Sequence, residues 1–148
     1  MALPLGAWAQ EAALLTLVAP DGRRIVLDAA AMDALPQQEL RTRTVWTEGP
    51  QTFGGVALRD VLALAGSEAD LKPRTLVLHA LNDYEITVPA ADAWSFPCII
   101  ARSQNGSPIS RRDKGPLWLV YPRDADPVLQ DQRYDQRWVW QLSEIVIA

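Results

Sequence analysis

The chain has 148 residues, the size of one domain with its own hydrophobic core. Hydrophobic residues make up 49% of it and charged residues 22%, an ordinary globular composition, and the net charge of −4 argues against a nucleic-acid-binding surface. No apolar run reaches the length of a transmembrane helix, so we do not expect the chain to span a membrane.

Residues 1–9 have the character of a targeting segment. Ala7-Trp8-Ala9, followed by Gln10, matches the small-residue cleavage pattern at the end of a secretory signal peptide. A frayed apolar terminus is the alternative interpretation. We therefore expect residues 1–9 to be the end of a signal peptide, residues 10–148 to form a single domain, and the mature protein to be periplasmic.

Alternating or β-branched runs bounded by turn residues are typical of strands. They predict strands at residues 14–19, 23–27, 39–46, 75–80, 84–88, 99–103, 108–110, 117–121 and 138–147. Pro20-Asp21-Gly22 and Asn105-Gly106 each predict a hairpin turn between two of these runs. Asp28 predicts the N-cap of a short helix at residues 29–35, and another short helix is expected to begin near Pro89.

A central helix is predicted at residues 56–65, where apolar residues recur at helical spacing. Gly54 and Gly55 are expected to let the chain turn sharply into this helix. Gly66 is expected to end it in the left-handed conformation. The complete pattern predicts an α+β fold that is mostly β, a mixed sheet with short helices.

Four motifs occur in an order that resembles a known family. They are Phe53-Gly54-Gly55 followed by Leu58-Arg59-Asp60-Val61-Leu62, then Asn82-Asp83-Tyr84, then Gly115-Pro116-Leu117, then Trp138-Val139-Trp140. Over residues 40–147 this order resembles the molybdopterin-binding domain of the sulfite oxidase family. The resemblance implies that family's fold and a pterin site built from these segments.

The chain lacks the residue that binds the metal in this family. In that family one cysteine before the aromatic-glycine turn holds molybdenum, but the corresponding residues 40–46 contain no cysteine. Cys98 is the only cysteine and lies in another part of the pattern, in an apolar run that favours a buried structural role. His79 is the only histidine and is expected to pack or bond locally. Molybdenum favours a thiolate, so no metal site is expected.

The resemblance also implies a set of ligand-binding residues. The family's arginine after Pro-Leu corresponds to Trp118 here, and its lysine to Trp140, which suggests a pterin without the phosphorylated, metal-bearing part. The expected ligand-binding residues are Trp46, Asn82, Asp83, Tyr84, Arg112, Asp113, Lys114, Arg137, Trp138 and Trp140.

The chemistry of a pterin gives these residues distinct roles. Tryptophan or tyrosine can stack on the flat ring. Asp113 or Asp83 can accept two N–H groups from the aminopyrimidine edge, and basic side chains or Asn82 can donate to the carbonyl and ring nitrogens. The alternative is that the tryptophans fill the core and that Arg112-Asp113-Lys114 is a solvated turn.

The chain further resembles a cysteine-less subgroup of small exported proteins. These bind a free neopterin- or monapterin-like pterin and regulate the periplasmic domain of a membrane-bound cyclic-di-GMP enzyme, and through it biofilm formation. No Ser-His-Asp arrangement emerges around the one histidine and there is no Gly-rich phosphate loop, so no catalytic residues are predicted. The alternatives are a molybdopterin-dependent oxidoreductase of the sulfite oxidase family and an interaction module with a vestigial pocket.

Overall fold

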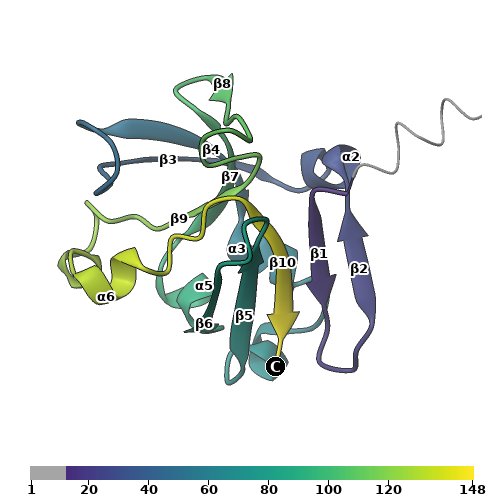
Figure 1. Cartoon of the computed structure of the whole chain (residues 1–148). Helices are drawn as coiled ribbons and strands as arrows, with labels where there is room; N and C mark the ends of the chain where they lie inside the picture. The colour runs from purple at the N-terminus through teal and green to yellow at the C-terminus, as the bar shows by residue number, and fades with distance from the viewer. Residues whose placement is uncertain (1–12) are drawn as a thin grey trace, which may run out of the picture.

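The computed structural model describes residues 13–148, which form two β-sheets with short helices in the connections (Figure 1). The expected signal-peptide end, residues 1–9, lies outside the described residues. The strands are β1 (Leu15–Val18), β2 (Arg24–Leu27), β3 (Gln37–Thr42), β4 (Gln51–Ala57), β5 (Thr75–Ala80), β6 (Glu85–Pro89), β7 (Ile99–Gln104), β8 (Ser107–Pro108), β9 (Trp118–Val120) and β10 (Leu142–Ile147). The helices are α2 (Ala29–Asp33), α3 (Leu58–Leu62), α4 (Glu68–Leu71), α5 (Asp92–Ser95), the 3-10 helix η1 (Pro127–Leu129) and α6 (Gln132–Asp135). This confirms the predicted α+β class, and no helix of the described chain is long and apolar enough to cross a membrane.

The two sheets contain five strands each. The first has the order β2-β1-β10-β5-β6, in which β1 and β10 are parallel and the other neighbours antiparallel. The second has the order β3-β4-β7-β8, and β9 also pairs with β7. In the first sheet Leu17 lies opposite Ile145, which lies opposite Leu78, and all three are fully buried. Such rows form the core, because alternate residues of a strand face the same side.

The locally encoded turns and caps form as predicted. Gly22 has a φ of 88° between the antiparallel strands β1 and β2. Asn105 and Gly106 have φ values of 53° and 85°, the two positive values that a type I′ turn requires between β7 and β8. The Asp28 side chain accepts a hydrogen bond of 2.9 Å from the Ala31 N–H at the start of α2.

The prediction for the central glycines is wrong. Gly54 and Gly55 lie inside β4, and α3 begins only at Leu58. A Cβ on Gly55 would lie 2.0 Å from the backbone oxygen of Ile100 in the neighbouring strand β7, so this glycine permits close strand contact at an irregularity of the ladder. Gly66 does not take the left-handed conformation; α3 ends at Leu62, and Gly66 lies against the Leu71 side chain.

Two predicted strands are shorter in the structure than in the sequence interpretation. Strand β3 ends at Thr42, so Trp46 lies in the loop that leads to β4. Strand β10 begins at Leu142, and the residues before it form one isolated bridge, between Trp140 and Trp118. The aromatic residues of both segments are therefore presented by irregular backbone, which directs them toward one cavity.

Candidate functional site: an aromatic cavity

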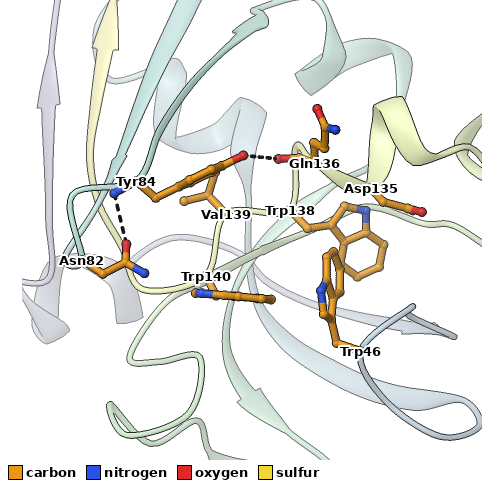
Figure 2. A pocket seen from close by; sticks show the side chains of 8 residues that line it. All are labelled: Trp46, Asn82, Tyr84, Asp135, Gln136, Trp138, Val139 and Trp140. Carbon is orange, nitrogen blue, oxygen red and sulfur yellow. Dashed lines mark hydrogen bonds between the residues drawn. The ribbon is translucent and has the colours of Figure 1, made fainter.

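A cavity of about 260 Å³ lies where the β3–β4 loop, the β5–β6 turn and the segment before β10 meet (Figure 2). Figure 2 shows the rings of Tyr84 and Trp140 on opposite sides of this space, with Trp46 and Trp138 at one end and Asn82 at the other. The cavity is lined by Trp46, Asn82, Tyr84, Asp135, Gln136, Trp138, Val139 and Trp140. We call it the aromatic cavity. Two rings facing each other across a gap suit a flat ligand that stacks on both.

Trp46 is held by hydrogen bonds within its own loop. Its backbone N–H donates to Thr44 Oγ1 at 3.0 Å, and the hydroxyls of Thr44 and Thr47 are 2.7 Å apart. The loop is anchored to the chain before η1, because the Arg43 N–H donates to the Asp124 carboxylate at 2.9 Å. These bonds fix the end wall of the aromatic cavity without any regular secondary structure.

Tyr84 is positioned by the tight turn between β5 and β6. Asp83 has a φ of 68°, and the Tyr84 N–H donates to Asn82 Oδ1 at 3.1 Å. The Tyr84 hydroxyl donates to the backbone oxygen of Gln136 at 3.2 Å, which joins the turn to the opposite wall. Because Asn82 Oδ1 is engaged, its amide N–H₂ group remains as a donor, and it points into the space between the Tyr84 and Trp140 rings (Figure 2).

Two ion pairs hold the segment that supplies Gln136, Trp138 and Trp140. Asp92 is 5% exposed, and its Oδ2 accepts from Arg137 Nη1 at 2.6 Å and from the Tyr121 hydroxyl at 2.9 Å. Asp135 Oδ1 accepts from Arg123 Nε at 2.9 Å. Burial raises the pKa of Tyr121 first, and the nearby Cys98 and Asp92 raise it further, so its hydroxyl stays protonated and donates.

The tryptophans form one cluster, part core and part cavity wall. The Trp46 ring centroid lies 5.3 Å from that of Trp140 and 5.6 Å from that of Trp138, both at steep interplanar angles. Trp118 is fully buried behind them, as one of the alternative interpretations expected. Trp118 Nε1 and Trp138 Nε1 are both buried with no hydrogen-bond partner in the described chain, which is costly for a donor.

The structure brings together half of the predicted ligand-binding residues. Trp46, Asn82, Tyr84, Trp138 and Trp140 all line the aromatic cavity. The residues that do not line it are the other members of the predicted set: Asp83, Arg112, Asp113, Lys114 and Arg137.

The predicted charged contacts are directed elsewhere. Asp83 lines a separate open hollow with His79 and Glu85. The Asp113 side chain is 57% exposed and pairs with Lys114 Nζ at 3.0 Å. Lys114 Nζ lies 5.3 Å from the ring centroid of Trp140 and so supports the floor of the cavity as a cation–π partner.

The two predicted arginines also lie apart from the cavity lining. Arg137 turns inward to Asp92, with its guanidinium 4.3 Å from the ring centroid of Tyr134. Arg112 is exposed. The arrangement therefore brings neither a carboxylate fork nor a free cation from the predicted set into the aromatic cavity.

The sequence interpretation missed the cavity residues Asp135, Gln136 and Val139. Asp135 and Gln136 come just before Arg137, and Val139 lies between Trp138 and Trp140, so their position in the sequence could have indicated them. The exposed Asp124 also contributes, because its carboxylate anchors the loop of Trp46. In Figure 2 the Asp135 carboxylate is directed away from the gap between the facing rings, consistent with its pairing to Arg123.

The lone cysteine does not line the aromatic cavity. Cys98 is 1% exposed and lies by a separate small hollow with Ala93 and Pro97. Burial, and secondarily the negative charge of Asp92, raises the pKa of the Cys98 thiol far above its ordinary value, so it remains a thiol at neutral pH. No cluster of three metal-ligating side chains occurs within residues 13–148.

The comparisons with known proteins agree with the fold. The sequence profile of the oxidoreductase molybdopterin-binding domain family matches residues 24–125. The chain belongs to this family. Among solved structures, it is similar to the sulfane dehydrogenase SoxCD from Paracoccus pantotrophus, with a TM-score of 0.65 and 17% sequence identity over 90% of this chain and 37% of that one. The chain thus spans little more than a third of that relative's length, and the search of curated protein sequences gives no significant match.

Membership of this family raises the question of whether its residues fit molybdopterin. Tyr84 and Trp140 lie on opposite sides of the cavity and offer faces on which a flat pterin ring can stack, and the Asn82 amide offers a donor at one end. The metal-bearing part does not fit, since the buried Cys98 supplies no thiolate to the aromatic cavity. The cavity volume of about 260 Å³ is slightly below the roughly 300–1,000 Å³ of common small-molecule pockets.

Proposed function

We propose that this protein is a non-catalytic pterin-binding regulator that holds a neopterin- or monapterin-like ligand without molybdenum in the aromatic cavity. The observation that carries the proposal is the pair of facing rings, Tyr84 and Trp140, with the Asn82 amide at one end of the space between them. Stacking on two faces stabilises any flat heteroaromatic ring, and one directed donor orients it.

The fates of the basic residues support an unphosphorylated ligand. Arg137 is paired with the buried Asp92, Arg123 with Asp135, and Lys114 lies against Trp140 while paired with Asp113. A phosphate in a small cavity needs a cation or several backbone donors. With these cations committed elsewhere, a neutral pterin suits the site better than its phosphorylated, metal-bearing derivative.

The wider role follows from the resemblance to small exported pterin-binding proteins. In this proposal the protein is exported to the periplasm, and its pterin-bound form regulates the periplasmic domain of a membrane-bound cyclic-di-GMP enzyme. Tyr84, at the cavity, is 43% exposed, so a partner could sense the presence of the ligand directly through this ring.

The test is a titration of the purified protein with oxidised and reduced pterins, followed by quenching of tryptophan fluorescence. Removal of one stacking ring costs about 1–3 kcal/mol for a stacked heterocycle, so Trp140→Ala should weaken the dissociation constant roughly 5- to 150-fold. Trp140→Phe retains a ring and should weaken it less. Arg112→Ala is the control, because its exposed side chain lies outside the cavity lining; thermal melts check folding. Equal affinities for wild type and Trp140→Ala would place the pterin elsewhere.

A second candidate function is a molybdopterin-dependent oxidoreductase, favoured by the family to which the chain belongs. Elemental analysis of protein made in a molybdenum-replete host separates the two. The regulator should contain no stoichiometric molybdenum and show no sulfite- or sulfoxide-dependent electron transfer. A near-equimolar molybdenum content would favour the oxidoreductase, whereas protein that binds neither metal nor pterin would be an interaction module with a vestigial cavity.

A further inference from the structure

Strand β3 (Gln37–Thr42) is an outer edge strand of the second sheet. None of its residues lines the aromatic cavity. Among residues 13–148 the strand pairs only with β4, along its whole length and on one side. Gln37, Gln38, Glu39 and Arg41 are exposed, and Leu40 is partly buried. An edge strand with exposed side chains presents a template for one more strand.

The hydrogen-bonding register shows which backbone groups of β3 are available. Thr52 of β4 lies opposite Arg41, but its C=O accepts from the Asn105 N–H at 2.7 Å and its N–H donates to Asn105 Oδ1 at 2.9 Å. Both groups of Thr52 are thus directed away from β3. In an antiparallel pair, two directly opposite residues either bond to each other or both direct their backbone groups away from each other. Arg41 therefore directs its N–H and C=O away from β4, toward the open edge of the sheet. Glu39, two residues earlier, does the same, so within the described chain both residues present unbonded backbone groups at this edge.

The same alternation shows where the available part of the β3 edge ends. Arg43, two residues beyond Arg41, also points its N–H outward, and this N–H is already bonded to Asp124 at 2.9 Å. The available ladder is therefore short and centred on Leu40. Such a ladder can add a strand but cannot support a long sheet extension, which suits a weak, reversible association.

The charges on this edge are complementary to themselves under a two-fold rotation. If a second copy of β3 pairs antiparallel with its axis at Leu40, Glu39 of each copy lies opposite Arg41 of the other. Within the described chain neither Glu39 nor Arg41 is in an ion pair. Glu39 lies opposite Gly54, and Arg41 Nη1 donates to the hydroxyl of Thr52, the residue opposite it, at 3.4 Å. Opposite charges placed directly across strands stabilise the pairing, and like charges there destabilise it.

We propose that β3 is the self-association edge of this protein, which forms a two-fold symmetric dimer by antiparallel β3–β3 pairing centred on Leu40. The pairing joins the second sheets of the two copies through the N–H and C=O groups of Glu39 and Arg41. It adds two reciprocal Glu39–Arg41 pairs and a Leu40–Leu40 contact on the opposite face. The interface is isologous, so it closes at the dimer and does not propagate into fibres.

The test is sedimentation velocity over a wide concentration series with charge-reversed variants. Wild type should dimerise reversibly, and Glu39→Arg or Arg41→Glu should each weaken self-association about tenfold, because each places like charges opposite one another twice. The double variant Glu39→Arg/Arg41→Glu should restore it. An equimolar mixture of the two single variants should also associate, since the reversed residues are then opposite in charge across the interface.

These side chains are exposed and face no charged neighbour on β4, so the variants should fold, which thermal melts check. A wild type that remains monomeric throughout the series would overturn the proposal. So would single variants that associate like wild type, or a folded double variant and a mixture that both remain monomeric. Pterin binding is measured separately, so the outcome does not depend on the proposed function.

Discussion

Removing one member of the ion pair behind the aromatic cavity should be among the more destabilising single changes in the fold. Asp92 is 5% exposed and accepts both the Arg137 guanidinium and the Tyr121 hydroxyl. Asp92→Ala leaves a positive charge and a buried hydroxyl without their acceptor at the same time. Each of these groups would need solvation that the surrounding aromatic residues do not provide.

The size of the effect can be estimated from the geometry. Removing one partner of a buried pair costs roughly 3–5 kcal/mol, and the lower end applies here because the Arg137 side chain is 21% exposed and stays stacked on Tyr134. About 3 kcal/mol corresponds to a melting temperature lowered by roughly 6–12 °C in a domain of this size. Asp92→Asn keeps an acceptor oxygen without the charge and should lie between wild type and the alanine variant.

Thermal and urea unfolding followed by far-ultraviolet circular dichroism provide the assay. Arg137→Met should be destabilising by itself because it leaves Asp92 as an unpaired buried charge. The double variant Asp92→Ala/Arg137→Met should cost less than the sum of the two single changes, since residues in one pair are coupled. If Asp92→Ala melts within about 2 °C of wild type, or the two effects simply add, the pair does not have the role assigned to it.

Three other predictions test separate parts of the account. Gly55→Ala should lower the melting temperature by roughly 5 °C or more, or prevent folding, because the new Cβ would meet the Ile100 backbone oxygen. Gly22→Ala, which has open space around its Cβ position and only the strain of a φ of 88°, should cost less. Cys98 should resist a thiol reagent at neutral pH and react once guanidinium unfolds the chain; a thiol that reacts fully in the native protein would contradict its burial. Because the pKa of Cys98 is raised in the folded state, the free energy of unfolding should fall as the pH rises above about 8.5. N-terminal sequencing of protein recovered from the periplasm should begin at Gln10, and an intact terminus upstream of Ala9 would refute the export prediction.

The elements that the sequence predicts correctly are those with local causes. Asn105-Gly106 has only a few conformations open to it, and Asp28 caps the helix that begins beside it. Gly54 and Gly55 were assigned to a turn because the reason for Gly55 is not local. Its missing Cβ makes room for β7, a strand more than forty residues away in sequence.

The candidate site was predictable in its aromatic part and not in its charged part. The resemblance to the family selects the segments that carry the aromatic residues, and tryptophan or tyrosine provides area and a flat face wherever it borders a cavity. The direction in which an arginine or lysine side chain points depends on the residue with which it pairs. Nothing near Arg137 in sequence reveals that its partner is Asp92, and nothing near Lys114 shows that it supports Trp140 from outside the cavity lining.

The measurement that tests the central claim most directly is a combined mass spectrum and elemental analysis of small molecules released from freshly purified protein. The account predicts a near-stoichiometric, unphosphorylated pterin, no equimolar molybdenum, and loss of that pterin from a folded Trp140→Ala variant. Release of molybdopterin with equimolar molybdenum, or the absence of pterin from protein that also fails to bind it in titration, would contradict the account.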